Sequence, residues 1–192
     1  MVNRAVTPGF NQLAVLLWQE APRKNQDISI KMKKETDEYA EFMLRQYRLV
    51  DAYWFLSVEK KYGLSSAVEM NEEVWEHLSA KTAREIKRRF GIDKKGLDGL
   101  VKALSYYPWT RITGYEIKKD TGKITLTVAH CPPQEGRIKS GLGEFPCKKM
   151  HIKDFSAFAK EIDERIEIRC VHAPPDEHLK ERFCEWVFTL RK

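Results

Sequence analysis

The apolar residues of this chain change their spacing once, and that change most restricts the folds open to it. Between residues 35 and 105 they recur at the three- and four-residue intervals of amphipathic helices. From residue 111 onward they recur mainly at every second position, which is typical of strands with one buried face. Helices followed by strands predict an α+β fold, with N-terminal helices packed on an antiparallel sheet of about four strands.

Three helices are predicted before the sheet. The first covers about residues 35–61 and ends at Gly63, which suits a left-handed C-cap. Its apolar stripe comprises Tyr39, Phe42, Met43, Val50, Tyr53, Trp54 and Val58. The second helix runs from Asn71, as N-cap, to Phe90. The third covers roughly residues 97–105.

Two strand pairs are predicted, with an amphipathic helix at about residues 154–163 between them. Residues 111–118 and 123–129 form a hairpin, and residues 166–172 and 183–190 form the second pair. If Ile168 lies opposite Trp186 in that second pair, then Cys170 lies opposite Cys184, with Cβ atoms about 5 Å apart.

Length and composition predict one domain. With 192 residues, 42% of them hydrophobic, the chain can bury a core without disulfides or metal. Residues 1–31 differ from the rest and are interpreted as an arm or leader. Residues 32–192 form the domain, divided into a helical part (35–105) and a sheet part that holds the cysteines (106–192). No apolar run is long enough to cross a membrane, so we expect a cytoplasmic protein with reduced thiols.

The positive net charge does not favour nucleic acid as a partner. Residues 1–34 carry six basic and two acidic side chains, so they hold +4 of the chain's net charge of +6. The body is therefore nearly neutral, whereas nucleic-acid-binding domains concentrate positive charge on one face. A nucleic-acid or protein interaction module is kept as an alternative function.

All four cysteines and four of the five histidines lie between His130 and Cys184. Thiolate and imidazole bind zinc, and thiolates hold iron–sulfur clusters. The candidate metal ligands are Cys131, Cys147, Cys170, Cys184 and His172. The gaps of 16, 23 and 14 residues between the cysteines contain no close-spaced knuckle, so buried or pocket-lining thiols without a cofactor are an equal alternative.

Other residues are candidates for catalysis or for ligand binding. Cys131 ends a strand before two prolines and is the candidate nucleophile of a small hydrolase. A basic loop in residues 134–149 could hold an anion, and a carboxylate in the apolar first helix could line a pocket. The candidate ligand-binding residues are Asp51, Trp54, Glu59, Arg137 and Lys148.

Four segments resemble an uncharacterised family of small prokaryotic proteins. They are residues 51–63 (DAYWFLSVEKKYG), 141–148, 162–170 and 173–188, and the resemblance covers about residues 36–190. The ending from Glu167 to Phe188, with Cys131-Pro132 before it, is also similar to 4-vinyl reductase (V4R) type domains. That likeness implies an α+β fold that binds a small ligand, sometimes with cysteine-bound metal. At His172 the chain departs from the uncharacterised family, which would place a second cysteine there.

A further resemblance, to the aminothiazoline-carboxylate hydrolase family, implies C–N or C–S hydrolysis. The sequence thus predicts a domain that binds a small molecule or a metal at a cysteine-lined site. The alternatives are a hydrolase that uses Cys131 or a bound metal, and an interaction module. A homodimer is compatible with each of them.

Overall fold

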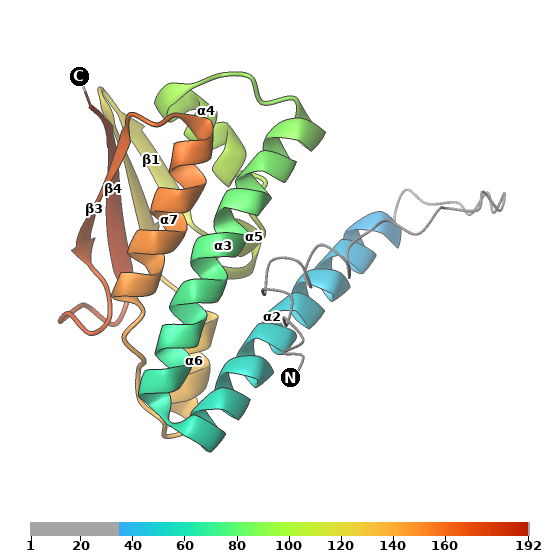
Figure 1. Cartoon of the computed structure of the whole chain (residues 1–192), viewed down its shortest axis with the longest axis vertical. Coiled ribbons are helices and arrows are strands. Elements are labelled where there is room, and N and C mark those ends of the chain that lie inside the picture. The colour runs from blue at the N-terminus through green and yellow to red at the C-terminus, as the bar shows by residue number, and fades with distance from the viewer. Residues whose placement is uncertain (1–34, 192) are drawn as a thin grey trace, which may run out of the picture. The chain divides into compact units, whose positions relative to one another are not determined.

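The computed structural model describes residues 35–191, most of which belong to one compact unit that begins at Glu38 (Figure 1). The predicted arm, residues 1–31, lies outside the described residues. The helices are α2 (Glu35–Tyr62), α3 (Leu64–Phe90), α4 (Gly96–Leu104), α5 (Pro108–Thr113), α6 (Pro132–Lys139) and α7 (Lys148–Ile162). The strands are β1 (Glu116–Asp120), β2 (Lys123–Val128), β3 (Ile166–His172) and β4 (Cys184–Leu190). None of the described helices is long and apolar enough to span a membrane.

The strands form an antiparallel sheet in the order β1-β2-β4-β3. Residues at every second position of β2 and β4 are buried on one face, where Leu126 lies opposite Trp186. Phe155 and Phe158 of α7 are almost fully buried in the same core, and Phe155 packs edge-on against Trp186 with 5.3 Å between ring centroids. The sheet therefore has one covered face, which confirms the predicted α+β fold.

The other helices are arranged around α7. Helix α7 lies between the sheet and α3, and α2 runs obliquely along the outer side of α3 (Figure 1). Phe55 is the most deeply buried apolar side chain of α2. It packs against Phe145, which lies in the segment before α7, with 4.9 Å between ring centroids. Helix α2 is thus anchored at one end, beside α6.

The predicted start of the second helix is wrong. Helix α3 begins at Leu64, directly after Gly63, and Asn71 is a buried residue inside it rather than its N-cap. Gly63 has φ +87°, a value that glycine adopts without steric cost. A sharp corner at this glycine lets the chain start a second helix without a loop, so the capping preference of Asn71 does not decide where α3 begins.

The predicted apolar stripe of the first helix is also wrong. Most of its members are exposed, among them Val50 at 69% and Tyr53 at 67%. The inward face of α2 instead carries Tyr47, Asp51, Phe55 and Glu59. Polar side chains can face inward here because Glu59 pairs with a buried arginine of α6 and Asp51 faces a cavity.

Residues 108–150 contain more helix than predicted. The predicted first strand begins in α5, and β1 starts at Glu116. The segment around residues 134–149, interpreted as a loop, contains α6 and the first turn of α7. Pro132 and Pro133 occupy the first positions of α6, where a missing amide hydrogen costs no helical hydrogen bond. These prolines therefore start a helix and do not extend a loop.

The predicted pairing of Cys170 with Cys184 is wrong by a register shift of two residues. Ile168 lies opposite Phe188, so Cys170 lies opposite Trp186, and Cys184 pairs across the other side of β4 with Val128. An irregularity between Cys170 and His172 then brings His172 opposite Glu185. A two-residue shift keeps every side chain on its face, so alternation in the sequence could not distinguish the two registers.

Candidate functional site

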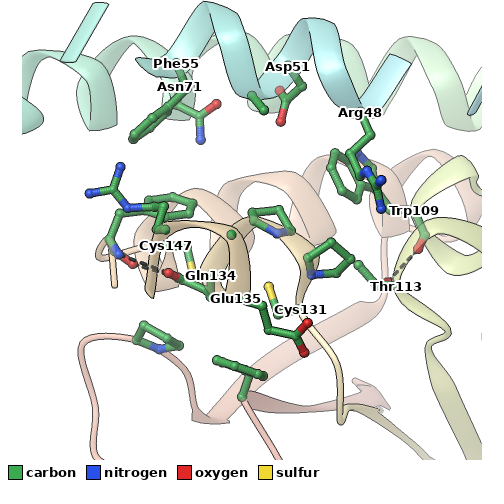
Figure 2. A pocket seen from close by; sticks show the side chains of 18 of the residues that line it. Arg48, Asp51, Phe55, Asn71, Trp109, Thr113, Cys131, Gln134, Glu135 and Cys147 are labelled. Atoms are coloured by element: carbon green, nitrogen blue, oxygen red, sulfur yellow. Dashed lines mark hydrogen bonds between the residues drawn. The ribbon is translucent and has the colours of Figure 1, made fainter. Parts of the chain in front are cut away.

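A cavity of about 560 Å³ lies between α2 and the elements that face it, which are α3, α5, α6 and α7 (Figure 2). It reaches the sheet at Val128 and Cys184. Its volume falls in the range of roughly 300–1,000 Å³ that is usual for small-molecule sites. Five of the aromatic side chains on its walls are Phe55, Trp75, Trp109, Phe145 and Phe155. The cavity is the candidate site because aromatic rings, polar groups and thiols all line it.

The wall formed by α2 and α3 carries the polar groups. Arg48, Asp51 and Phe55 recur at intervals of three and four residues, so they share one face of α2. Asn71 and Trp75 do the same on α3. Figure 2 shows Arg48, Asp51 and Asn71 directed from these two helices toward the side of the cavity that holds Cys131.

Two of these polar side chains are buried without full compensation. Asn71 is only 4% exposed, and its amide forms no hydrogen bond with any residue in the range 35–191. Burial raises the pKa of Asp51 from 3.8 to about 6, and the Trp75 side chain opposes part of that rise. Asp51 forms no ion pair within the described part of the chain. Asp51 keeps acceptor capacity beside its contact with Trp75, and Asn71 also lines the cavity, so both can engage a ligand there.

Three of the four cysteines line the cavity, each at the start of an element. Cys131 precedes α6, Cys147 precedes α7 and Cys184 begins β4. The Gln134 amide holds the second of these segments, because it donates to the Phe145 carbonyl at 2.8 Å and to the Cys147 sulfur at 3.4 Å. The three thiols therefore come from distant segments of the chain.

The thiols are in their neutral form near neutral pH. Burial raises the pKa of Cys131 and of Cys184 to about 12, and it raises the pKa of Cys147 further. A nucleophilic cysteine needs a lowered pKa, because the thiolate is the reacting species. The environment of Cys131 therefore does not favour the predicted nucleophile.

Cys170 and His172 do not line this cavity. Cys170 lies on β3, an edge strand, and the His172 ring nitrogen Nε2 lies 3.2 Å from the Arg182 carbonyl oxygen. Within residues 35–191 no group of three or more histidine, cysteine, aspartate or glutamate side chains is arranged to hold a metal ion. Of the five predicted metal ligands, the structure brings together Cys131, Cys147 and Cys184 as lining residues of one cavity.

The predicted ligand-binding residues have different outcomes. Asp51 lines the cavity, whereas Trp54 lies on the outer side of α2 in a shallow groove. Glu59 and Arg137 form a two-pronged ion pair, and Arg137, also a lining residue, is only 6% exposed. Lys148 pairs with Asp176, with 2.7 Å between the ammonium and the nearer carboxylate oxygen. Neither basic side chain is available to hold an anion, because each already has a carboxylate partner.

The structure adds a histidine that lies beside a buried carboxylate. His151 lines the cavity, and its Nδ1 lies 3.2 Å from Oδ2 of Asp154, three residues further along α7. Ser79 of α3 and Tyr107 donate to the other oxygen of Asp154, Tyr107 at 3.0 Å. This network ties α3 to α7 and fixes the orientation of the imidazole. The spacing of three residues could have indicated the pair, but the helix was predicted to begin only at residue 154.

Family comparison agrees with the resemblance seen in the sequence. None of the curated proteins and none of the solved structures is similar enough to this chain to count as a match. The likeness to V4R-type domains and to aminothiazoline-carboxylate hydrolases thus receives no support from relatives. One family matches, and it covers residues 29–190, most of the chain. The chain therefore belongs to the family described as Family of unknown function (DUF6125).

Proposed function

We propose that this protein binds a small, largely apolar organic molecule in the cavity between α2 and α7. The observation that carries this proposal is a cavity of about 560 Å³ that combines aromatic walls with two polar side chains, Asp51 and Asn71, on one side. Ligand sites usually combine apolar walls with a few polar groups that orient the ligand. A small-molecule ligand is also what the resemblance to V4R-type domains implies.

Stability alone would not select such a cavity. Protein interiors are packed as densely as organic crystals, and a void forfeits the dispersion contacts of the atoms that line it. Apolar side chains in place of Asn71 and Asp51 could fill this space more cheaply, so their presence argues for a partner.

A metal site is the second candidate, because Cys131, Cys147 and Cys184 line the same cavity. The described residues do not fit a tetrahedral zinc site as they stand, since no three potential ligands are suitably arranged. The raised pKa values of the three thiols also mean that binding a metal would have to release their protons. We therefore favour the organic ligand, and metal content of anaerobically purified protein decides between the two.

Binding of 1-aminoanthracene, a neutral fluorescent probe for apolar sites, tests the proposal. Ala52→Phe places a ring in the cavity, because Ala52 is one of its lining residues. Ser57→Phe adds the same ring on the exposed side of the same helix and serves as the control. We expect saturable binding to the natural protein and to the Ser57→Phe variant, and loss of binding in the Ala52→Phe variant. Equal binding by both variants, or no saturable binding by the natural protein, would contradict the proposal.

A further inference from the structure

The polar wall of the cavity restricts the class of ligand that it would take. We infer that the ligand is a neutral planar ring whose edge presents an N–H donor beside an acceptor, as in a carboxamide or a lactam. Asp51 and Asn71 would bind that edge. This inference rests on the proposed function and adds the chemistry of the ligand.

The hydrogen-bonding capacity of Asp51 and Asn71 determines which donors and acceptors the ligand must carry. An ionised Asp51 only accepts hydrogen bonds, so it requires a donor on the ligand. Asn71 both donates and accepts, and its side chain lines the cavity. A ligand edge with one N–H group and one carbonyl oxygen satisfies both side chains.

The charges on this wall favour a neutral ligand. Arg48 lies three residues before Asp51 on the same face of α2, and it forms no ion pair within residues 35–191. A cationic group on the ligand that bound Asp51 would also lie near the Arg48 guanidinium. An anionic group that bound Arg48 would also lie near the Asp51 carboxylate. Coulomb repulsion in a partly buried site penalises both arrangements.

The aromatic walls favour a flat ring. Trp75 and Trp109 pack edge-to-face with 5.6 Å between their ring centroids, and both line the cavity. Phe55 lies on the same wall beside Asn71 in Figure 2. Aromatic side chains pack on flat rings in stacked or edge-to-face arrangements, which saturated chains cannot match.

On the opposite side of the cavity, two of the polar side chains are already engaged. The Gln134 side chain exchanges two hydrogen bonds with the backbone of Phe145. Glu135 lies 3.3 Å from the His130 imidazole. Gln134 and Glu135 are therefore less available to a ligand than Asp51 and Asn71 on the side formed by α2 and α3.

Four ring-matched probes test the inference by competition with 1-aminoanthracene. Benzamide has the donor and the acceptor, acetophenone lacks the donor, benzamidine is cationic and benzoate is anionic. We expect benzamide to bind about tenfold more tightly than acetophenone, since it adds at least one hydrogen bond to buried groups. Benzamidine and benzoate should bind more weakly than benzamide.

Two variants show whether the named side chains cause the preference. Asn71→Leu and Asp51→Leu should each reduce the preference for benzamide over acetophenone to about twofold or less. If Asn71→Leu does not fold, Asn71→Asp removes the donor with little change in volume. Equal binding of the four probes by the natural protein would overturn the inference while the cavity remains a binding site. Failure of 1-aminoanthracene to bind at all would instead overturn the proposed function.

A second inference comes from the outer face of α2, where only Tyr53 of the exposed apolar residues also lines the cavity. We propose that a second copy of this chain packs there, with the two α2 helices antiparallel. The face exposes Tyr39, Phe42, Met43, Val50, Tyr53 and Trp54, a larger apolar stripe than isolated surface residues would form. Apolar stripes of this kind usually mark an interface.

Charge complementarity favours a second copy over another partner. Glu38 is exposed near the start of α2, at the margin of this face, and Lys60 and Lys61 are exposed near its end. A two-fold axis near Val50 places the acidic start of one α2 opposite the basic end of the other. Such a surface is complementary to itself, which is the requirement for a symmetric dimer.

Sedimentation velocity of the full chain tests this arrangement. Val50→Glu should produce monomers because it brings two carboxylates together at the axis, whereas Leu179→Glu, equally exposed on a loop between β3 and β4, should leave the dimer unchanged. Reversing Lys60 and Lys61 to glutamate should weaken the dimer about tenfold or more, and reversing Glu38 to lysine in the same chain should restore it at least in part. A monomeric natural protein at tens of micromolar, or a failure of the second reversal to restore the dimer, would overturn the proposal.

Discussion

Replacing Asp51 with asparagine should stabilise the protein near neutral pH. Burial raises the pKa of this carboxyl group from 3.8 to about 6. The folded state therefore binds the proton more tightly than the unfolded state, and the stability that Asp51 contributes is lost as pH rises from about 4 to about 6. Above that window, the folded protein holds a partly buried carboxylate that the Asp51→Asn variant does not have.

The size of the effect follows from the shift. A rise of about two pKa units corresponds to about 3 kcal/mol at 1.36 kcal/mol per unit. Asp51 keeps contact with solvent through the cavity, so screening reduces this value, and we expect a gain of about 1–2 kcal/mol at pH 7.5. At about pH 4 the carboxyl group is neutral in the folded protein, and the difference between the two proteins should be small.

Urea unfolding followed by circular dichroism at the two pH values measures this difference. Glu38→Gln, an exposed carboxylate removed from the same helix, is the matched control and should change stability little at either pH. If the Asp51→Asn variant is no more stable than the natural protein at pH 7.5, the carboxylate is not destabilised by burial and the reasoning is refuted. A gain in stability together with weaker binding of benzamide would indicate that Asp51 is retained for its ligand.

Four further results are expected. Glu59→Gln should cost about 3 kcal/mol in urea unfolding, because it leaves the buried Arg137 guanidinium without a carboxylate, and a cost below about 1 kcal/mol would contradict this. Cys170 should react first with iodoacetamide in the native protein, as located by mass spectrometry. Burial raises the pKa of Cys131 and of Cys184 to about 12 and that of Cys147 further, whereas Lys148 and Arg169 oppose the rise that burial causes in the pKa of Cys170. Gly99→Ala should be strongly destabilising, since its Cβ would lie 1.9 Å from the Lys94 carbonyl oxygen. Gly136→Ala, with open space and a helical position, should be neutral or stabilising by about 0.5–1 kcal/mol in the same assay.

The sequence predicted the secondary structure best in segments where the spacing of apolar residues kept one period from end to end. The bounds of β3 were predicted without error, and β4 and the end of α7 differ by one residue from the prediction. The start of α3 was missed because a preferred capping residue, Asn71, occurs inside the helix. Helix α6 was missed because its two prolines indicate a turn as readily as the first positions of a helix.

The candidate site could be predicted only in part. The position of Asp51 within an apolar helix identified it as a pocket candidate, and the clustering of cysteines brought Cys131, Cys147 and Cys184 to attention. Asn71 had no such signal, because its type and position matched a common structural role. Arg137 and Lys148 were predicted for an anion, and the structure gives each of them a carboxylate partner from a distant segment.

The sequence by itself determined the fold class, the order of the four strands and of the three longest helices, and the buried face of the sheet. Those properties follow from local periodicity, which each segment carries independently of its neighbours. Only the tertiary structure decided the register of β3 on β4, the inward face of α2 and the set of side chains that share the cavity. Each of these choices depends on packing between distant segments: a two-residue shift preserves alternation, and α2 has apolar side chains on both sides. Gly63, between the end of α2 and the start of α3, sets the angle between these two helices. It thereby places Asp51 of α2 and Asn71 of α3 on one wall of the cavity.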